Sequence, residues 1–293
     1  MILTKSQRQR YGSALLLSFP ALVGLILFHY WPIFEMLRIS FLDYKIFTGE
    51  FTWKGTENYV VAVQDPIFLQ TLKTTVWFFF LKVPLQTVLA LGLALIMTRG
   101  GRGIGFIRTI ILLPAVTAMV VASTVWGFML HPDNGLVNSM LTTIGLSAQP
   151  FLASATQALP SIAFITIWKQ VGLNTLFFMA GLLTIPGVYY EAGKVDGASV
   201  WQSFRHVTLP LLKPTTAFVL ITSTIAAFKV FVPVKVLTDG GPASATRVIV
   251  LYIFELAFQY NRLGYAATIS VFVAVILIAF SFIQLRTSRE SER

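Results

Sequence analysis

The chain has 293 residues, of which 56% are hydrophobic and only 12% are charged, with a formal net charge of +10. A soluble domain of this length cannot bury so much apolar surface, so the composition predicts a membrane protein. The absence of cysteine excludes disulfides, thiol catalysis and cysteine metal sites. The basic residues are spread over separate segments, which argues against a nucleic-acid partner and fits contact with anionic membrane lipids.

Six apolar segments are long enough to cross a bilayer, because a spanning helix needs roughly 20 residues. In chain order, the expected helices cover about 12–34, 74–98, 107–131, 157–185, 215–236 and 264–286. The second carries Lys82 and Pro84, and the fifth carries Lys229. For both lysines we expect the head group to reach an interface while the apolar stem stays in the membrane, with a position facing the bundle interior or the pathway as the alternative. The predicted fold is an all-α membrane protein with a single transmembrane domain.

Lysine and arginine concentrate on one side of this six-helix arrangement. They occur before the first helix, after the second, after the fourth and after the sixth, whereas the opposite loops are balanced or only mildly basic. Because cytoplasmic loops accumulate positive charge, both termini and the segment 188–213 are predicted to be cytoplasmic. The loop 37–73 is then periplasmic, and its polar part, 43–65, could form a small extramembrane element.

The segment 188–213, between the fourth and fifth helices, has the pattern of a helical hairpin. Ala192, Val195 and Ala198 recur at helical spacing. Asp196 is expected to cap the following helix through its carboxylate, and Gly197 to supply the positive φ of the turn. A second stripe consists of Trp201, Phe204, Thr208 and Leu211. Such a hairpin is usually a plain connection, but the order of its residues indicates contact with another protein.

The hairpin also carries a recognisable motif, formed by Glu191, Ala192, Gly193, Gly197, Val207, Leu209 and Pro210. It resembles the cytoplasmic signature of permease subunits of binding-protein-dependent ABC importers, usually written Glu-Ala-Ala, a downstream Gly, and a later Ile-x-Leu-Pro. Here Gly193 replaces the second alanine and Val207 replaces the isoleucine. The spacing is intact, although the glycine is expected to loosen the first helix.

Other landmarks follow the order of the same family over roughly 13–285. They are Phe106, Arg108 and Pro114; Trp126, Gly135, Asn138 and Leu141; and Leu182, Ile185 and Pro186. The stretch LTDGGPASAT at 237–246, followed by Tyr252, Ala257, Phe258 and the run 264–267, is similar to the sugar-uptake branch, which includes maltose, lactose and glycerol-phosphate permeases.

The resemblance implies a bacterial inner-membrane complex. An extracytoplasmic solute-binding protein delivers a sugar or oligosaccharide, this chain and a second, homologous permease subunit form the pathway, and an ATPase dimer drives transport. The chain has no GxxxxGK[ST] loop, so it is expected to bind no cofactor itself, and ATP and Mg²⁺ would be bound by the partner ATPase.

The resemblance assigns ATPase coupling to Glu191, Ala192, Gly193, Asp196, Gly197, Ala198, Trp201, Leu209 and Pro210. Glu191 is expected to pair with a basic ATPase residue, Gly197 to form the tight turn, and Ala192, Val195, Ala198 and Trp201 to form the packed contact. For Trp201 and Phe204, packing within the hairpin or at the membrane surface remains an equal alternative.

Polar side chains within the spans indicate the substrate pathway, because they are costly in lipid and tend to face a bundle interior; the candidates are Lys82, Lys169, Gln170, Asn174 and Lys229. Gln170 and Asn174 lie one helical turn apart and could bind sugar hydroxyls, although hydrogen bonding between helices is an equally common role. The ring-bearing candidates for stacking on a sugar are Trp168, Phe228 and Phe231. For these, lipid contact or core packing is the alternative.

The sequence leaves three alternatives open. Glycerol phosphate or another polyol could replace the sugar as cargo. A stand-alone secondary transporter would need carboxylates within its spans, whereas the acidic residues here fall in loops or near helix ends. A non-transporting scaffold would leave the motif unexplained. No metal-ligand spacing or catalytic pair is present among the three histidines and their neighbours, so neither a metal nor a catalytic residue is expected.

Overall fold

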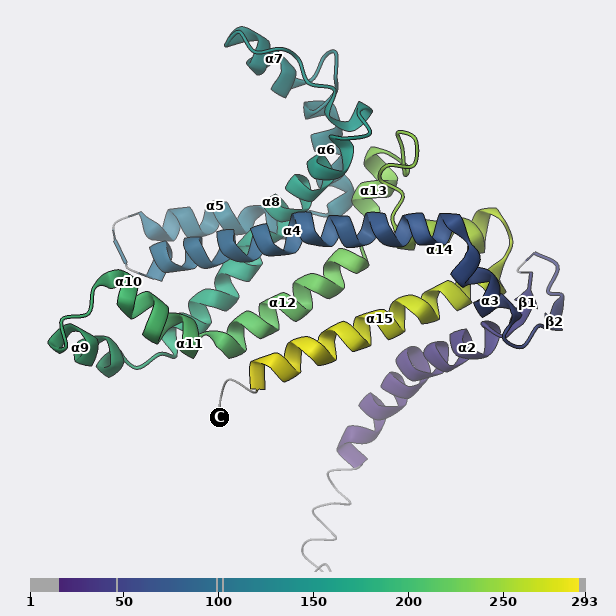
Figure 1. Ribbon diagram of the computed structural model, residues 1–293, viewed down its shortest axis with the longest axis horizontal. Coiled ribbons are helices and arrows are strands. Elements are labelled where there is room, and N and C mark those ends of the chain that lie inside the picture. The colour runs from purple at the N-terminus through teal and green to yellow at the C-terminus, as the bar shows by residue number, and fades with distance from the viewer. Residues whose placement is uncertain (1–15, 46, 99, 102, 290–293) are drawn as a thin grey trace, which may run out of the picture. The chain divides into compact units, whose positions relative to one another are not determined.

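The computed structural model describes residues 16–289 except 46, 99 and 102. The expected start of the first helix at 12 and the basic residues before it lie outside this range. The chain divides into two compact units, one formed by the described residues up to Asp65 with Ile253–Phe272, the other by Pro66–Tyr252 with the residues from Val273 onward. The elements are shown in Figure 1.

In the first unit, the described part of the first helix covers Leu16–Ile39, so this helix ends five residues later than the predicted end at 34. Its second half comprises the π-helix η1 (Ile26–Tyr30) and α2 (Trp31–Ile39). The unit continues with β1 (Leu42–Tyr44), β2 (Phe51–Trp53) and α3 (Glu57–Gln64), and it includes the π-helix η4 (Glu255–Gln259) and the start of α15 (Leu263–Arg289).

The two strands form an antiparallel pair that pairs Leu42 with Trp53 and Tyr44 with Phe51, so the prediction of an all-α fold misses this small sheet. Aromatic cross-strand contacts explain it, since the rings of Tyr44 and Phe51 lie 6.5 Å apart. Asn58 of α3 donates hydrogen bonds to the carbonyls of Ser40 and Leu42 at 3.1 and 2.9 Å. The polar segment 43–65 is therefore a folded element.

The second unit contains most of the helices. They are α4 (Pro66–Thr98), α5 (Ile104–Val116), α6 (Met119–Met129), α7 (Leu136–Thr143), η2 (Phe151–Ala153), α8 (Ala158–Leu183), α9 (Gly187–Val195), α10 (Val200–Ser203), η3 (Phe204–Thr208), α11 (Leu209–Leu211), α12 (Lys213–Phe228), α13 (Val232–Leu237), most of α14 (Ile249–Phe254) and the part of α15 from Val273 onward.

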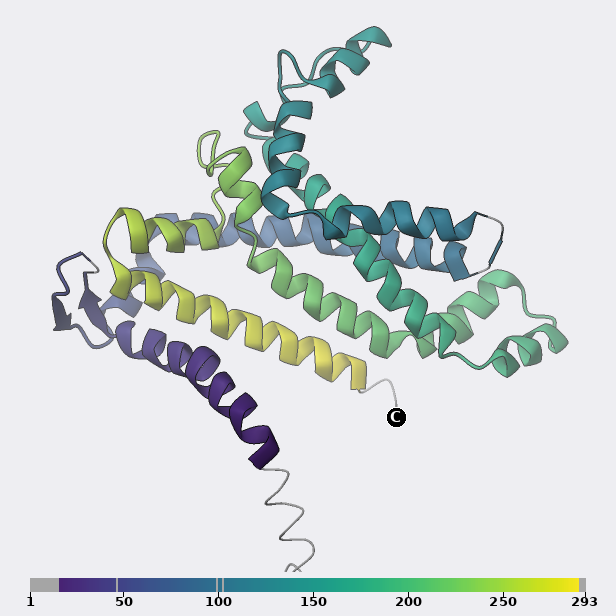
Figure 2. The ribbon, with the colours of Figure 1, turned by 180° about the vertical axis from the view of Figure 1, so that it is seen from behind.

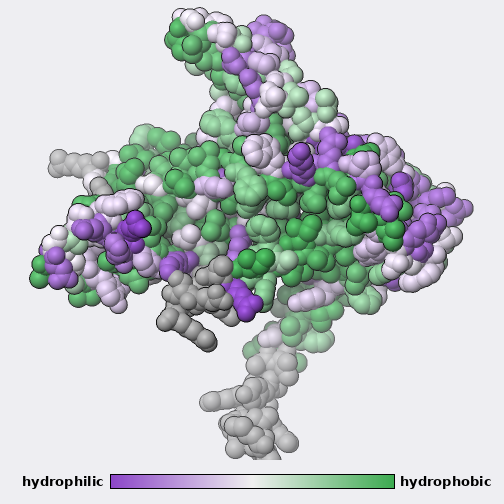
Figure 3. Space-filling model, in the orientation of Figure 1, coloured by the Kyte–Doolittle hydropathy of each residue, from purple (hydrophilic) through white to green (hydrophobic). Residues whose placement is uncertain are grey.

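The core of the second unit lies where α4, α8 and α12 pack together (Figures 1 and 2). One hydrophobic cluster joins Phe78, Ile162 and Phe228, which belong to these three helices in turn. A second cluster joins the same helices further along, through Ala94 and Phe178 among others. Hydrophobic side chains also cover the outer surface over α4 (Figure 3), as a membrane-embedded bundle requires.

The expected second helix begins at Pro66 rather than at 74. Proline suits the first helical position, because the N–H it lacks would be unpaired there. The hydroxyls of Thr71 and Thr75 then donate to the carbonyls of Phe68 and Thr71 at 2.9 and 2.8 Å, so these polar side chains remain satisfied inside the helix.

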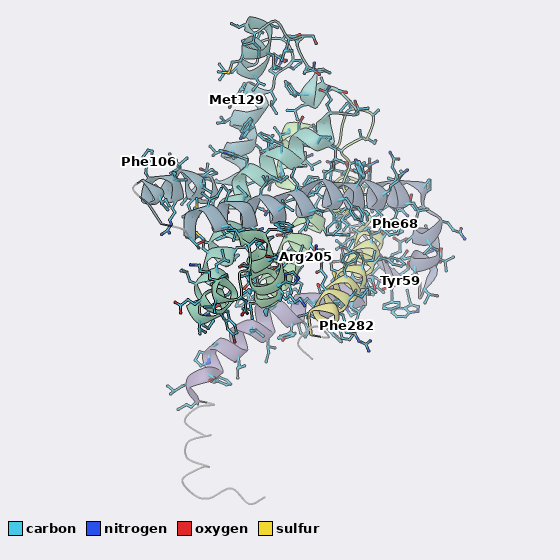
Figure 4. The ribbon with its side chains drawn as sticks, turned by 60° about the vertical axis from the view of Figure 1, so that its left-hand side comes forward. Tyr59, Phe68, Phe106, Met129, Arg205 and Phe282 are labelled. Carbon is cyan, nitrogen blue, oxygen red and sulfur yellow. The ribbon has the colours of Figure 1, made fainter. Side chains whose placement is uncertain are left out.

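The expected third helix is broken rather than continuous. α5 and α6 meet at an angle of 100°. Pro114 lies in the last turn of α5. Thr117 and Ala118, the two residues between α5 and α6, have an extended backbone. Figure 4 labels Phe106 and Met129 near the two far ends of this bent pair.

Five helices of the described chain are long and apolar enough to cross a membrane, and six if the bent pair counts as one span. One of these spans, Lys213–Leu237, includes both α12 and α13, which are separated by a short non-helical step before Pro233. The chain is therefore a mostly helical, multi-pass membrane protein.

Candidate functional site

The hairpin between α8 and α12 consists of α9, α10, η3 and α11. α9 ends in a tight turn, where the N–H of Ala198 donates to the carbonyl of Gly193 at 2.8 Å and the N–H of Gly197 to that of Lys194 at 3.1 Å. Gly197 has a φ of +73°, in the left-handed region that favours glycine. The sequence locates this turn correctly.

The cap of the second hairpin helix is Ser199, not Asp196 as predicted. The Ser199 hydroxyl accepts a hydrogen bond from the N–H of Gln202 at 3.3 Å, and the Gln202 side chain accepts one from the N–H of Ser199 at 2.7 Å. This reciprocal pair is a capping box. Asp196 instead forms the C-cap of α9, because the turn at Gly197 moves the start of α10 to Val200.

The tip of the hairpin exposes apolar side chains next to an acidic one. Val195 is 88% exposed and Trp201 is 66% exposed. Ala192 and Glu191 are also exposed, and no ion pair involving Glu191 is found within the described residues. Figure 3 shows hydrophilic side chains around this hairpin, and Figure 4 labels Arg205 on it. An exposed apolar tip with a carboxylate beside it is a surface suited to a protein partner.

The two arms of the hairpin are held together by side chains. The hydroxyl groups of Tyr190 and Thr208 lie 3.1 Å apart and share a hydrogen bond. The rings of Trp201 and Phe204 are 5.5 Å apart, so Trp201 packs within the hairpin on one side while it remains largely exposed on the other. A cavity of about 910 Å³ separates the hairpin from the ends of α4 and α8.

A second feature is a polar cavity of about 320 Å³ among α5, α8 and α12. We name it the polar cavity after Lys169, Gln170, Asn174, Thr222 and Ser223, although the rest of its lining, Ala115, Leu173, Phe177 and Ala226, is apolar. The amide of Asn174 donates to the hydroxyl of Ser223 at 2.9 Å and so joins α8 to α12. Gln170 and Asn174 therefore hydrogen-bond to neighbouring helices, one of the two roles expected from the sequence, and they also line a cavity; the binding of sugar hydroxyls stays a prediction.

Contrary to the prediction, Lys82 does not reach a membrane interface. Its side chain is only 1% exposed, and its ammonium group donates to the Oε1 of Gln170 at 2.9 Å. This bond joins α4 to α8. The structure instead fits the alternative, a lysine that faces the bundle interior, because a polar partner on a neighbouring helix satisfies Lys82 there. Lys229, in contrast, is exposed.

The three aromatic candidates lie away from the polar cavity. Trp168 contacts the ring of Trp126 on α6, with 5.4 Å between centroids. Phe228 is 2% exposed and packs against Phe79 and Phe280 in the core. Phe231 packs against the same core cluster. Of the five residues predicted for the pathway, the structure brings only Gln170 and Asn174 together in this cavity.

Close helix contact positions the wall of the cavity. A Cβ atom added to Gly172 of α8 would clash with the backbone of Ile111 on α5, so only glycine allows this approach. The amine of Lys169 donates to the carbonyls of Pro114 and Ala115, at 3.4 and 3.3 Å, beside the break between α5 and α6. In the sequence, the only signals for this contact are Gly172 within α8 and Pro114 near the end of α5.

No group of three or more histidine, aspartate or glutamate side chains in the described residues could hold a metal ion. The site is instead a membrane-embedded polar cavity together with a structured hairpin that offers an apolar and acidic surface. These features define a multi-pass helical membrane protein with a candidate partner-binding hairpin.

The chain belongs to the family described as "Binding-protein-dependent transport system inner membrane component", whose model matches residues 13–290. It is 35% identical over 280 residues to the lactose transport system permease protein LacF of Rhizobium radiobacter, with 92% of each chain covered. It is 35% identical over 272 residues to the sn-glycerol-3-phosphate transport system permease protein UgpA of Agrobacterium fabrum (strain C58 / ATCC 33970), again with 92% of each covered.

A solved structure shares this fold. It is a bacterial alginate ABC transporter in complex with an alginate pentasaccharide-bound periplasmic protein, and the matching chain is 26% identical with a TM-score of 0.83. The match covers 97% of this chain and 95% of the other. The family identifies the chain as a permease component of an ABC importer, so the stand-alone secondary transporter is not supported.

Proposed function

We propose that this chain forms half of the translocation pathway of an ATP-driven importer for a sugar or oligosaccharide. The observation that carries the proposal is the exposed tip of the hairpin, Glu191, Ala192, Val195 and Trp201, in a chain of the binding-protein-dependent family. A lactose permease and an alginate importer among the similar proteins support a saccharide cargo. The relative that transports glycerol 3-phosphate keeps a polyol phosphate as the second candidate.

Three kinds of partner complete the importer. A second, homologous permease subunit supplies the other half of the pathway, a solute-binding protein delivers the cargo from outside, and an ATPase dimer that binds ATP and Mg²⁺ supplies the energy. The alginate transporter, solved in complex with its periplasmic protein, supports the solute-binding partner. This chain has no phosphate-binding loop of its own.

The positive-inside rule places both termini and the hairpin in the cytoplasm, with six spans in the inner membrane of a bacterium. The hairpin would then sit in a groove of the ATPase. When the ATPase dimer closes around ATP, it would move the hairpin as a rigid body. The capping box and the Tyr190–Thr208 bond make the hairpin stiff enough to pass that motion to α8 and α12.

Charge reversal at Glu191 tests the coupling role. Glu191→Lys removes the expected ion pair with the ATPase and replaces it by repulsion, which we expect to reduce ATPase co-purification in mild detergent at least tenfold. Membrane insertion should be unchanged, because Glu191 is exposed and has no ion-pair partner among the described residues.

The matched control is Asp133→Lys, which reverses an exposed acidic side chain in the loop between α6 and α7. This variant should retain the ATPase. Normal transport by Glu191→Lys would remove Glu191 from the coupling surface. Native purification that recovers neither an ATPase nor a second permease, from a chain that still transports, would overturn the proposed function.

A further inference from the structure

The polar cavity among α5, α8 and α12 carries a positive charge that no nearby carboxylate balances. Lys169 lines it, and the sequences of α4, α5, α6, α8 and α12 contain no aspartate or glutamate. Its ammonium group has two long hydrogen bonds, at 3.4 and 3.3 Å, to backbone carbonyls. Charged groups are costly within a membrane bundle unless they serve a polar pathway, so this lysine calls for a functional explanation.

The buried Lys82 gives Gln170 a fixed orientation. A lysine ammonium has only donors, so the Oε1 of Gln170, 2.9 Å away, is the atom that accepts its hydrogen bond. The amide nitrogen of Gln170 is therefore turned away from Lys82. That nitrogen makes no hydrogen bond within the described chain, and Gln170 lines the cavity. The hydrogen bond to Lys82 thus leaves the two N–H donors of Gln170 available to a molecule bound in the cavity.

Two residues therefore offer several donors at one wall of the cavity, from the ammonium group of Lys169 and the amide of Gln170. A neutral sugar hydroxyl both donates and accepts, so it gains no particular advantage from a wall of donors. A carboxylate or a phosphate only accepts at neutral pH, and its hydrogen bonds to charged donors are the stronger kind. The volume of about 320 Å³ is within the range of small-molecule sites.

We propose that the transported cargo carries an anionic group, a carboxylate or a phosphate on a sugar or polyol, that binds Lys169 and the Gln170 amide in this cavity. Lys82 is a positioning residue that sets the orientation of Gln170. The inference rests on the proposed import function and narrows its substrate class. It assigns to Lys82 and Lys169 a role in selecting cargo by charge.

The test uses the complete importer, with both permeases, the ATPase and the solute-binding protein, reconstituted in lipid vesicles. Uptake is measured for matched neutral and charged probes, digalactose against digalacturonate and glycerol against glycerol 3-phosphate. We expect a charged probe to enter at least tenfold faster than its neutral partner at low concentration. A difference between digalactose and digalacturonate indicates a site for a carboxylate, and a difference between glycerol and glycerol 3-phosphate indicates a site for a phosphate.

Variants then assign the residues. Lys169→Met should raise KM for the charged probe about tenfold or more with little change in the maximal rate, whereas Lys169→Arg should stay close to the parent. Lys82→Met should also raise KM and reduce the preference for charge, and Lys82→Arg should restore most of it. Lys73→Met, which removes an exposed lysine of the same helix α4, is the matched control and should change neither value.

The outcomes separate this inference from the proposed function. Equal uptake of neutral and charged probes overturns the inference and leaves sugar import intact. A Lys169→Met variant that lowers only the maximal rate, at unchanged KM, also overturns it. Failure of every probe to enter, with the ATPase and the binding protein both present, overturns the proposed function and the inference together.

Discussion

The contact between α5 and α8 gives the sharpest structural prediction. A Cβ atom at Gly172 would lie well inside the limit of ordinary contact, which begins at 3.4 Å, and the atoms it would meet are backbone atoms of Ile111 and Leu112. A backbone cannot rotate away as a side chain can, so Gly172→Ala must push the two helices apart by about 1 Å. Overpacking of this kind costs about 1–3 kcal/mol of unfolding free energy.

The assay is reversible unfolding of the purified chain from detergent micelles into sodium dodecyl sulfate, followed by tryptophan fluorescence. Gly92→Ala is the matched control, because Gly92 lies within α4 and a Cβ there meets nothing within 4 Å. We expect Gly172→Ala to unfold at lower denaturant than the parent, and Gly92→Ala to be at least as stable as the parent. Equal stability of the two variants would refute the close packing of α5 on α8.

Three further changes test the hairpin and the core. Gly193→Ala should stabilise α9 by about 0.5–1 kcal/mol in thermal unfolding, because its Cβ would meet Ser203 and Ala198 at ordinary contact distances; a loss of stability would contradict that geometry. Ser199→Ala should cost about 1 kcal/mol in the same measurement, by removing the capping box, and an unchanged transition would argue against it. Phe228→Ala should cost about 3 kcal/mol and lower the yield of folded protein, whereas a stable variant with only a raised KM would return Phe228 to the cargo pathway.

The hairpin shows how far local sequence patterns carry. The turn at Gly197 follows from local chemistry, since few residues other than glycine adopt its positive φ readily. The sequence predicts Asp196 as the N-cap, because aspartate is a good cap and precedes the glycine. The structure uses Ser199 instead, because the turn takes up Gly197 and Ala198 before α10 begins. The sequence places a cap only within a few residues.

In the polar cavity, by contrast, the sequence indicates some of the lining residues but not the partners they bind. Gln170 and Asn174 could be selected as one face of one helix, because their spacing is a property of the helix alone. Their partners, Lys82 and Ser223, come from α4 and α12 and are far away in the sequence. The aromatic candidates cannot be selected from the sequence in this way. Phe228 and Trp168 have suitable chemistry for stacking, but packing directs them into the core and toward α6.

By itself, the sequence determined that the chain is a multi-pass membrane protein and that a polar hairpin interrupts its spans. Both follow from composition and short-range patterns, because a lipid environment demands long apolar helices and a water-exposed turn demands glycine and caps. Only the tertiary structure decided that α5 and α6 meet at 100° and that Lys82 is buried against Gln170. Those outcomes depend on which helices become neighbours, and the burial and hydrogen-bond partners of a side chain are settled only by that packing.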